Sequence, residues 1–172
     1  TYGRLHNIPQ KGYSLLPSIF WCWDDTSKSN IDNWSYFAGK NHRSVLGGNP
    51  LMSEFANRNS SLTKYFDPLV DEVFKSYQNN ILITLQPGEI SQILIDIIKV
   101  SPSDWHWWIR LHPTSQNPPS ELIECLERHA PGRFDWQNAS RLPLYAILKK
   151  INVHVTNFSS TVLEAEKFGI QT

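Results

Sequence analysis

The sequence predicts an α/β fold in which a parallel sheet carries helices on both faces. The continuous apolar run at 81–85 is typical of a strand that is buried on both sides. A second strand is predicted at 105–111, and segments with apolar residues at helical spacing precede and follow it. Such alternation of strands and helices implies right-handed crossovers, and therefore parallel pairing of the strands.

Composition supports a folded chain and argues against several classes of partner. Of the 172 residues, 40% are hydrophobic and 12% aromatic, which predicts a sizeable core and not wholesale disorder. Sixteen basic and sixteen acidic residues give a formal net charge of zero. The chain thus lacks the basic surface typical of proteins that bind nucleic acids. No apolar run approaches the ~20 residues of a membrane helix, and no signal peptide is visible.

The first fifty residues predict a strand, a helix and a second strand after an irregular lead-in at 1–17. The run 18–23 is aromatic and β-branched, as buried strands are. Asp24-Asp25 provides the turn and N-cap chemistry of a helix start. The second strand, at 43–46, is broken by Gly47-Gly48-Asn49-Pro50. The apolar face of the helix between them is expected at Ile31, Trp34, Tyr36 and Phe37.

Two helices are predicted between residues 51 and 80. The first covers about 51–56. The second has apolar residues at helical spacing and a C-terminal stop at Asn79-Asn80. Its expected apolar face consists of Tyr65, Leu69, Val73 and Tyr77.

From residue 81 onward the alternation is regular. Pro102 ends a helix at 90–98, because the residue before a proline disfavours the helical conformation. The cluster Trp105-His106-Trp107-Trp108 alternates between the two faces of its strand, so core packing is expected in preference to stacking on a sugar. The remaining expected elements are a helix around 122–126, a short strand at 134–136, a helix at 144–150, a strand at 151–156 and a helix that opens at 161.

Two lone cysteines, Cys22 and Cys125, lie far apart in apolar segments. We expect both to be reduced residues of the core, and a single disulfide between them is the alternative that the sequence leaves open.

Three turns are expected to meet at one edge of the sheet. Ligands of parallel sheets collect outside the carboxyl ends of the strands, where the turns at 86–89, 110–113 and 156–161 lie. The last turn opens into a helix at Ser159-Ser160-Thr161, whose free N–H groups and hydroxyls suit a phosphate. Glu164, one turn further, could accept hydrogen bonds from a ribose. The alternative is that the serines only cap the helix and that Glu164 only favours its dipole.

His112 and Arg110 are the basic candidates at this edge. His112 can donate a hydrogen bond to a phosphate oxygen, and Pro113 fixes how the chain leaves the strand. Arg110 lies two residues earlier on the same face of the strand, and its fork could hold a phosphate with two hydrogen bonds. A surface or core role for the histidine is the alternative.

Metal and cofactor motifs are missing from the sequence. His106, His112, His129 and His154 have no zinc-like spacing with cysteines or carboxylates, and no Asp-x-Asp occurs. Neither a Walker A sequence nor a G-x-G-x-x-G occurs. We therefore expect no metal and no bound cofactor, and an ATPase or a dinucleotide enzyme is disfavoured.

Several of these motifs occur together in one known family. Leu111-His112-Pro113, the later run 156–165 and Phe168-Gly169-Ile170 together resemble the C-terminal half of GT-B glycosyltransferases of bacterial surface polysaccharides. These are the sialyl-, polysialyl- and related capsule or lipopolysaccharide transferases with His-Pro and Ser-Ser motifs. Gly48-Asn49-Pro50 is similar to a turn that often closes the N-terminal domain in these proteins. The nonhydrolysing nucleotide-sugar 2-epimerases share the same plan.

The resemblance implies a metal-independent glycosyltransferase that moves a sugar from a nucleotide-sugar to a surface glycan or glycolipid during polysaccharide biosynthesis. It implies a cytoplasmic protein that could work at the inner face of the membrane. His112 and Ser159, Ser160 or Thr161, with Arg110, would hold the donor phosphate. Glu164 would bind the ribose, and the segment 137–142 would lie near the base. Weaker substrate contacts are expected from Gln86, Gly88, Gln137, Asn138 and Asn157.

The same resemblance predicts the domain organisation. Residues 1–50 would be the end of an acceptor-side domain, 51–80 a helical linker, and 81–172 a Rossmann-like donor-binding domain truncated at its C-terminus. The chain is thus expected to be a piece of a longer protein, which would supply the rest of the N-terminal domain.

The catalytic residue stays unassigned. The sialyltransferases carry an acidic pair followed by Gly, whereas Asp24-Asp25 is followed by Thr26, so a turn role is expected. The chain alone is then incomplete for catalysis and could bind a donor without turning it over. Two alternatives remain: an epimerase-like enzyme, and a noncatalytic nucleotide-binding or interaction module.

Overall fold

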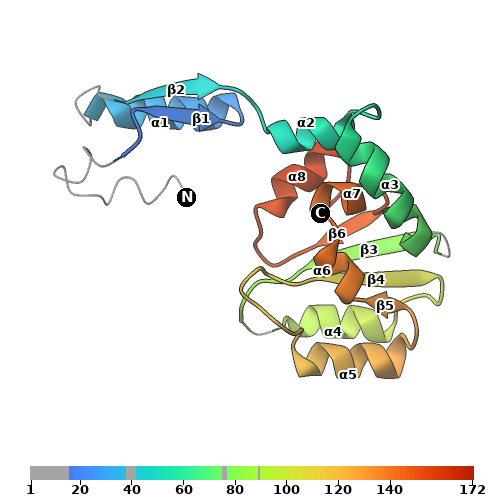
Figure 1. Cartoon of the computed structure of the whole chain (residues 1–172). Coiled ribbons are helices and arrows are strands. Elements are labelled where there is room, and N and C mark those ends of the chain that lie inside the picture. Colours follow the sequence, from blue (N-terminus) through green and yellow to red (C-terminus); the bar gives the residue numbers. More distant parts are fainter. Residues whose placement is uncertain (1–15, 38–41, 75–76, 89) are drawn as a thin grey trace. The chain divides into compact units, whose positions relative to one another are not determined.

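A computed structural model of the chain describes residues 16–37, 42–74, 77–88 and 90–172 (Figure 1). The side chains of Tyr36 and Phe37, two of the expected helix-face residues, lie outside what it describes. The chain divides into two compact units, residues 1–54 and 55–172, which we describe separately.

The first unit is a strand, helix and strand. β1 (Ile19–Cys22) pairs in parallel with β2 (Arg43–Leu46), and α1 (Asp25–Phe37) connects them. Cys22, Ile31 and Trp34 are buried in this unit, which confirms the predicted helix face at the two positions that are described. The aromatic and β-branched run forms a strand as predicted, but it is not buried: Ile19 and Trp21 are exposed, and of the residues of β1 only Cys22 is buried. Alternate residues of a strand point to opposite sides, so only one side of this strand can pack on the helix.

Side-chain caps begin the helices of this unit. The backbone N–H of Ser27 donates to Asp24 Oδ1 at 2.6 Å, which confirms the turn and N-cap role of the acidic pair. In the Gly-Asn-Pro turn, the N–H of Met52 donates to Asn49 Oδ1 at 3.1 Å, and α2 (Pro50–Ala56) starts there. The proline occupies the first turn of that helix, where its missing N–H costs nothing.

The second unit contains a four-stranded parallel sheet. Its strands are β3 (Asn79–Thr84), β4 (Trp105–Arg110), β5 (Phe134–Asp135) and β6 (Val153–Val155), in the order β5-β4-β3-β6. The chain adds β4 and β5 on one side of β3 and then returns to place β6 on the other side. The strand order therefore reverses between β3 and β6, which makes this gap the topological switch point of the sheet. The predicted Rossmann-like α/β class is confirmed.

Helices cover both faces of this sheet (Figure 1). The alternating residues Ile81, Ile83, Trp107 and Ile109 share a core with α4 (Gln92–Lys99) and α5 (Ser120–His129). On the opposite face, Trp108 stacks on Phe74 of α3 (Ser61–Phe74), with ring centroids 3.7 Å apart. The tryptophan cluster is therefore core, as predicted. The remaining helices are α6 (Gln137–Arg141), α7 (Leu144–Leu148) and α8 (Thr161–Lys167).

The helix at 61–74 differs from its predicted form in two respects. Its buried face is Thr63, Val70 and Phe74, whereas Tyr65 and Leu69 are exposed. Asn79 and Asn80 are not a helix stop but the first residues of β3. Asn80 is held there because its side-chain oxygen accepts a hydrogen bond of 2.8 Å from Trp108 Nε1 inside the core.

The helix α3 belongs to the second compact unit, which begins at Phe55 and not at residue 81. Lys149 and Lys150, at the end of α7, form ion pairs with Asp67 and Asp71 of α3; the Lys149–Asp67 distance is 2.5 Å. The segment predicted as a linker is thus partly a packed layer of the sheet domain.

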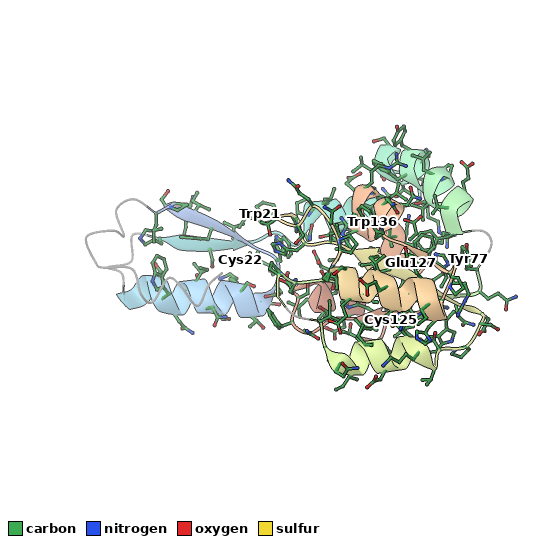
Figure 2. All side chains as sticks on the ribbon, turned by 90° about the horizontal axis from the view of Figure 1, so that it is seen from below. Trp21, Cys22, Tyr77, Cys125, Glu127 and Trp136 are labelled. Atoms are coloured by element: carbon green, nitrogen blue, oxygen red, sulfur yellow. The ribbon has the colours of Figure 1, made fainter. Side chains whose placement is uncertain are left out.

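Both cysteines are buried and free. Figure 2 shows Cys125 between α4 and α5, where its thiol lies 3.8 Å from the carbonyl oxygen of Ile95. Burial raises the pKa of both thiols, so they stay protonated at neutral pH. The prediction of reduced core residues is confirmed.

The structure contains, in the parts it describes, no helix that is both long and apolar enough to cross a membrane.

Candidate functional site

A cavity of about 420 Å³ lies at the carboxyl edge of the second unit's sheet. We call it the edge cavity. The loops that follow β3, β4 and β6 lie together at this edge (Figure 1), because parallel strands all end on the same side. The three turns expected to meet do contribute to one cavity, although Glu89 of the first turn lies outside the described residues. The residues that line the edge cavity are Thr84, Leu85, Gln86, Arg110, Leu111, His112, Pro113, Leu144, Phe158, Ser159, Ser160 and Thr161.

The imidazole of His112 is oriented by the loop that follows it. Its Nδ1 lies 2.7 Å from the hydroxyl of Thr114, and the backbone N–H of Thr114 donates to the same Nδ1 at 3.3 Å. Because Nδ1 accepts that hydrogen bond, the proton of the neutral ring is placed on Nε2. His112 thus offers the cavity an N–H donor.

The hydroxyls at the start of α8 divide into two kinds. Ser159 Oγ accepts the N–H of Thr161 at 3.2 Å and donates to Thr161 Oγ1 at 3.0 Å, so it closes a local turn before α8. Ser160 is exposed, and its hydroxyl makes no hydrogen bond within the described chain. Ser159 is thus occupied by a contact within its own turn, whereas Ser160 is the N-cap residue of α8 and its side chain makes no cap hydrogen bond.

Arg110 lines the cavity but already has backbone partners. Its Nη1 donates to the carbonyl oxygens of Ala139 at 2.7 Å and of Leu142 at 2.8 Å. These bonds tie the end of α6 to β4. Burial lowers the pKa of Arg110, partly offset by the charge of Glu164, but an arginine remains protonated. Its positive charge thus lies in the cavity wall, while one arm of the predicted phosphate fork is occupied.

Glu164 does not line the edge cavity. Its Oε1 accepts a hydrogen bond of 2.7 Å from the hydroxyl of Tyr145 on α7. This carboxylate joins α8 to α7.

The base-binding candidates on α6 are also outside the cavity. The backbone N–H of Asn138 donates to Asp135 Oδ1 at 2.8 Å, and its side-chain amide donates to Oδ2 at 2.7 Å. Asp135 therefore caps α6, and it occupies the Asn138 side chain in doing so. Gln137 is exposed and lines neither the edge cavity nor its neighbour. Gly88 also lies outside both cavities and has a φ of +132°, a conformation that favours glycine.

A second cavity of about 240 Å³ adjoins the first on the side of α4. We call it the α4 cavity. It shares Thr84, Leu85 and Gln86 with the edge cavity, and Asn157 lines only this one. Its other lining residues are Ile83, Ile90, Ser91, Ile93, Leu94, Ile97, Val155 and Thr156.

Buried polar contacts hold the ends of β3 and β6 together at the switch point. Thr84 Oγ1 lies 2.8 Å from Nε2 of the buried His154, and Thr156 Oγ1 donates to the carbonyl oxygen of Thr84 at 3.0 Å. Thr84, His154 and Thr156 are not among the predicted site residues. The available signals were Thr84 at the end of an apolar strand and His154 within another predicted strand.

Phe158 and Leu144 also line the edge cavity without having been predicted. Phe158 is 72% exposed. Its position within the Asn-Phe-Ser-Ser run was the only sequence feature that could have predicted a place in the site. No sequence feature predicted Leu144.

Among the described residues, no group of three or more histidines, cysteines or carboxylates comes together in a way that could hold a metal ion.

Comparison with known proteins identifies no family: neither a protein-family model nor a curated protein matches the chain.

Proposed function

We propose that this chain is the donor-binding part of a glycosyltransferase, and that the edge cavity holds the phosphate of a nucleotide-sugar. The observation that supports this most is the composition of one cavity at the switch point. The His112 N–H donor, the free Ser160 hydroxyl and the positive charge of Arg110 all line it. Such a group of donors without a carboxylate suits an anion.

The chemistry would be electrostatic. When the sugar leaves, negative charge develops on the donor phosphate, and preorganised donors at that position lower the barrier. In this proposal His112 donates from Nε2, Ser160 donates from its hydroxyl, and Arg110 contributes charge from the wall. No metal ion is required for that role. The attack by the acceptor would use a base that we do not assign to any residue of this chain.

The acceptor class follows from the motif resemblance alone. The His-Pro and Ser-Ser motifs favour a bacterial surface glycan or glycolipid as the acceptor. Such an acceptor would be used in capsule or lipopolysaccharide synthesis in the cytoplasm.

A noncatalytic nucleotide-binding module is the second candidate. It is favoured by the hydrogen bonds that already occupy Arg110 Nη1 and Glu164 Oε1.

Calorimetric titration with CMP, CDP, UDP and GDP tests the binding step. At least one nucleotide should bind saturably, and His112→Ala should weaken it by roughly 1–3 kcal/mol because a hydrogen bond to a charged group is lost. His129→Ala, which removes a histidine of α5 that lines neither cavity, is the matched control. Failure of all four nucleotides to bind would refute the proposal.

Transfer activity separates the two candidates. The full-length protein with a nucleotide-sugar should release nucleotide in the presence of an acceptor glycan. Saturable nucleotide binding without any transfer, across a panel of donors and acceptors, would support the noncatalytic module.

A further inference from the structure

The lining of the α4 cavity combines apolar and polar side chains. Ile93 and Ile97 of α4 form one wall, and Ile83 and Val155 of the neighbouring strands form another. Its volume of about 240 Å³ is below the roughly 300–1,000 Å³ of a typical whole-ligand site. It therefore suits one part of a ligand whose remainder lies elsewhere.

Three polar side chains of this cavity have no partner within the described structure. They are the amides of Gln86 and Asn157 and the hydroxyl of Ser91, which precedes α4 without capping it. The hydroxyls of Thr84 and Thr156, by contrast, are occupied by the contacts at the switch point. The lining thus includes two amides without a partner in the described structure, each with both a donor and an acceptor.

We propose that the α4 cavity binds the nucleobase of the nucleotide whose phosphate occupies the edge cavity. This inference rests on the proposed function. A base is a flat heterocycle with apolar faces and an edge of alternating donors and acceptors, and amide side chains are the groups that pair with such edges. An alkyl chain would fill the apolar walls but would leave both amides unpaired.

Continuity between the two cavities supports the assignment. Thr84, Leu85 and Gln86 line both, so a ligand that reaches from one to the other crosses the end of β3. The segment at 137–142, where the family resemblance places the base, lacks a free amide at Asn138 because Asp135 and Arg141 both bond to it.

The test compares ligands that differ only in the base. UMP, CMP, GMP and AMP are titrated into the chain by calorimetry, and ribose 5-phosphate is measured by competition against the tightest of them. The variants are Asn157→Ala, which removes one of these amides, and Ile97→Trp, which places a larger side chain in the lining of the cavity. Gln78→Ala removes an exposed amide that precedes β3 at the other end of the strand, and it is the control.

Both variants should weaken the tightest nucleotide at least ten-fold, leave ribose 5-phosphate within two-fold, and keep the wild-type urea midpoint. Wild-type nucleotide affinity in Asn157→Ala and Ile97→Trp, together with weakening by His112→Ala, would overturn the base assignment and leave the phosphate site intact. Equal weakening of nucleotide and ribose 5-phosphate would also overturn it, because the contact would then not be to the base. If no phosphate-bearing ligand binds the wild type, the proposed function fails and this inference fails with it.

Discussion

Lowering the pH should destabilise the second unit through one histidine, His106 of β4. Its side chain is 3% exposed, and neither ring nitrogen has a hydrogen-bond partner in the described structure. The ring stacks on Tyr77 at 3.7 Å and lies 4.4 Å from the ring of Trp108. Burial away from water lowers its pKa from 6.5 to about 4, and the charge of Asp135 opposes this only in part.

The size of this destabilisation follows from the difference in proton binding between the folded and the unfolded state. His106 is neutral in the folded state and takes up a proton more readily in the unfolded state, so unfolding binds protons between pH 6.5 and about 4. The free energy of unfolding is therefore unaffected by this group above pH 6.5 and falls as the pH drops below it. With 1.36 kcal/mol per unit of pKa, the loss is about 2.5 kcal/mol at pH 4.5 and slightly above 3 kcal/mol at lower pH.

Urea unfolding at pH 7.5 and at pH 4.5, for the wild type and for His106→Phe, measures this loss. Phenylalanine keeps an aromatic ring against Tyr77 but does not titrate. The wild type should lose about 2.5 kcal/mol more than the variant between the two pH values. Titration of the carboxylates is common to both proteins and cancels in the comparison. Equal losses would refute the reasoning, because they would mean that the ring is hydrated or hydrogen-bonded in the folded state.

Three further predictions concern contacts of the second unit. Trp108→Phe should lower the free energy of unfolding by about 1–3 kcal/mol, because Asn80 loses its buried donor; an unchanged urea midpoint would contradict this. Lys149→Ala should cost about 1 kcal/mol by removing the half-buried pair with Asp67, and the cost should shrink in 1 M salt; a salt-independent loss would point to packing instead. Ser160→Ala should weaken nucleotide binding by about 1 kcal/mol without changing stability, as measured by calorimetry and urea unfolding; loss of stability would show that the hydroxyl is structural.

The regular elements could be predicted from local sequence patterns. The run 43–46 and the apolar run after residue 80 form strands where expected, and Pro102 follows the end of α4. These signals are local, since they depend on side-chain periodicity and on backbone restrictions at proline.

The errors in the fold prediction have tertiary causes. Large apolar residues lie on more than one side of α3: Tyr65 and Leu69 are exposed, whereas Val70 and Phe74 are buried. Which side is buried depends on the stacking of Phe74 on Trp108, a residue of a strand far along the chain. The helix α6 was missed because its start depends on the Asp135 cap and its end on Arg110.

The candidate site was predictable in position but not in detail. Because ligands lie at the carboxyl ends of parallel strands, His112 and Ser160 are predicted to lie at the same edge, and both line the edge cavity. Which groups are free there depends on partners that no pattern shows. Tyr145 takes one oxygen of Glu164, and Asp135 takes the amide of Asn138.

A crystal structure with a bound nucleotide would locate the phosphate in the second unit. We expect a phosphate oxygen in the edge cavity, about 2.7–3.2 Å from His112 Nε2. A phosphate bound at the amino ends of the strands, or in contact with neither His112 nor Ser160, would contradict it.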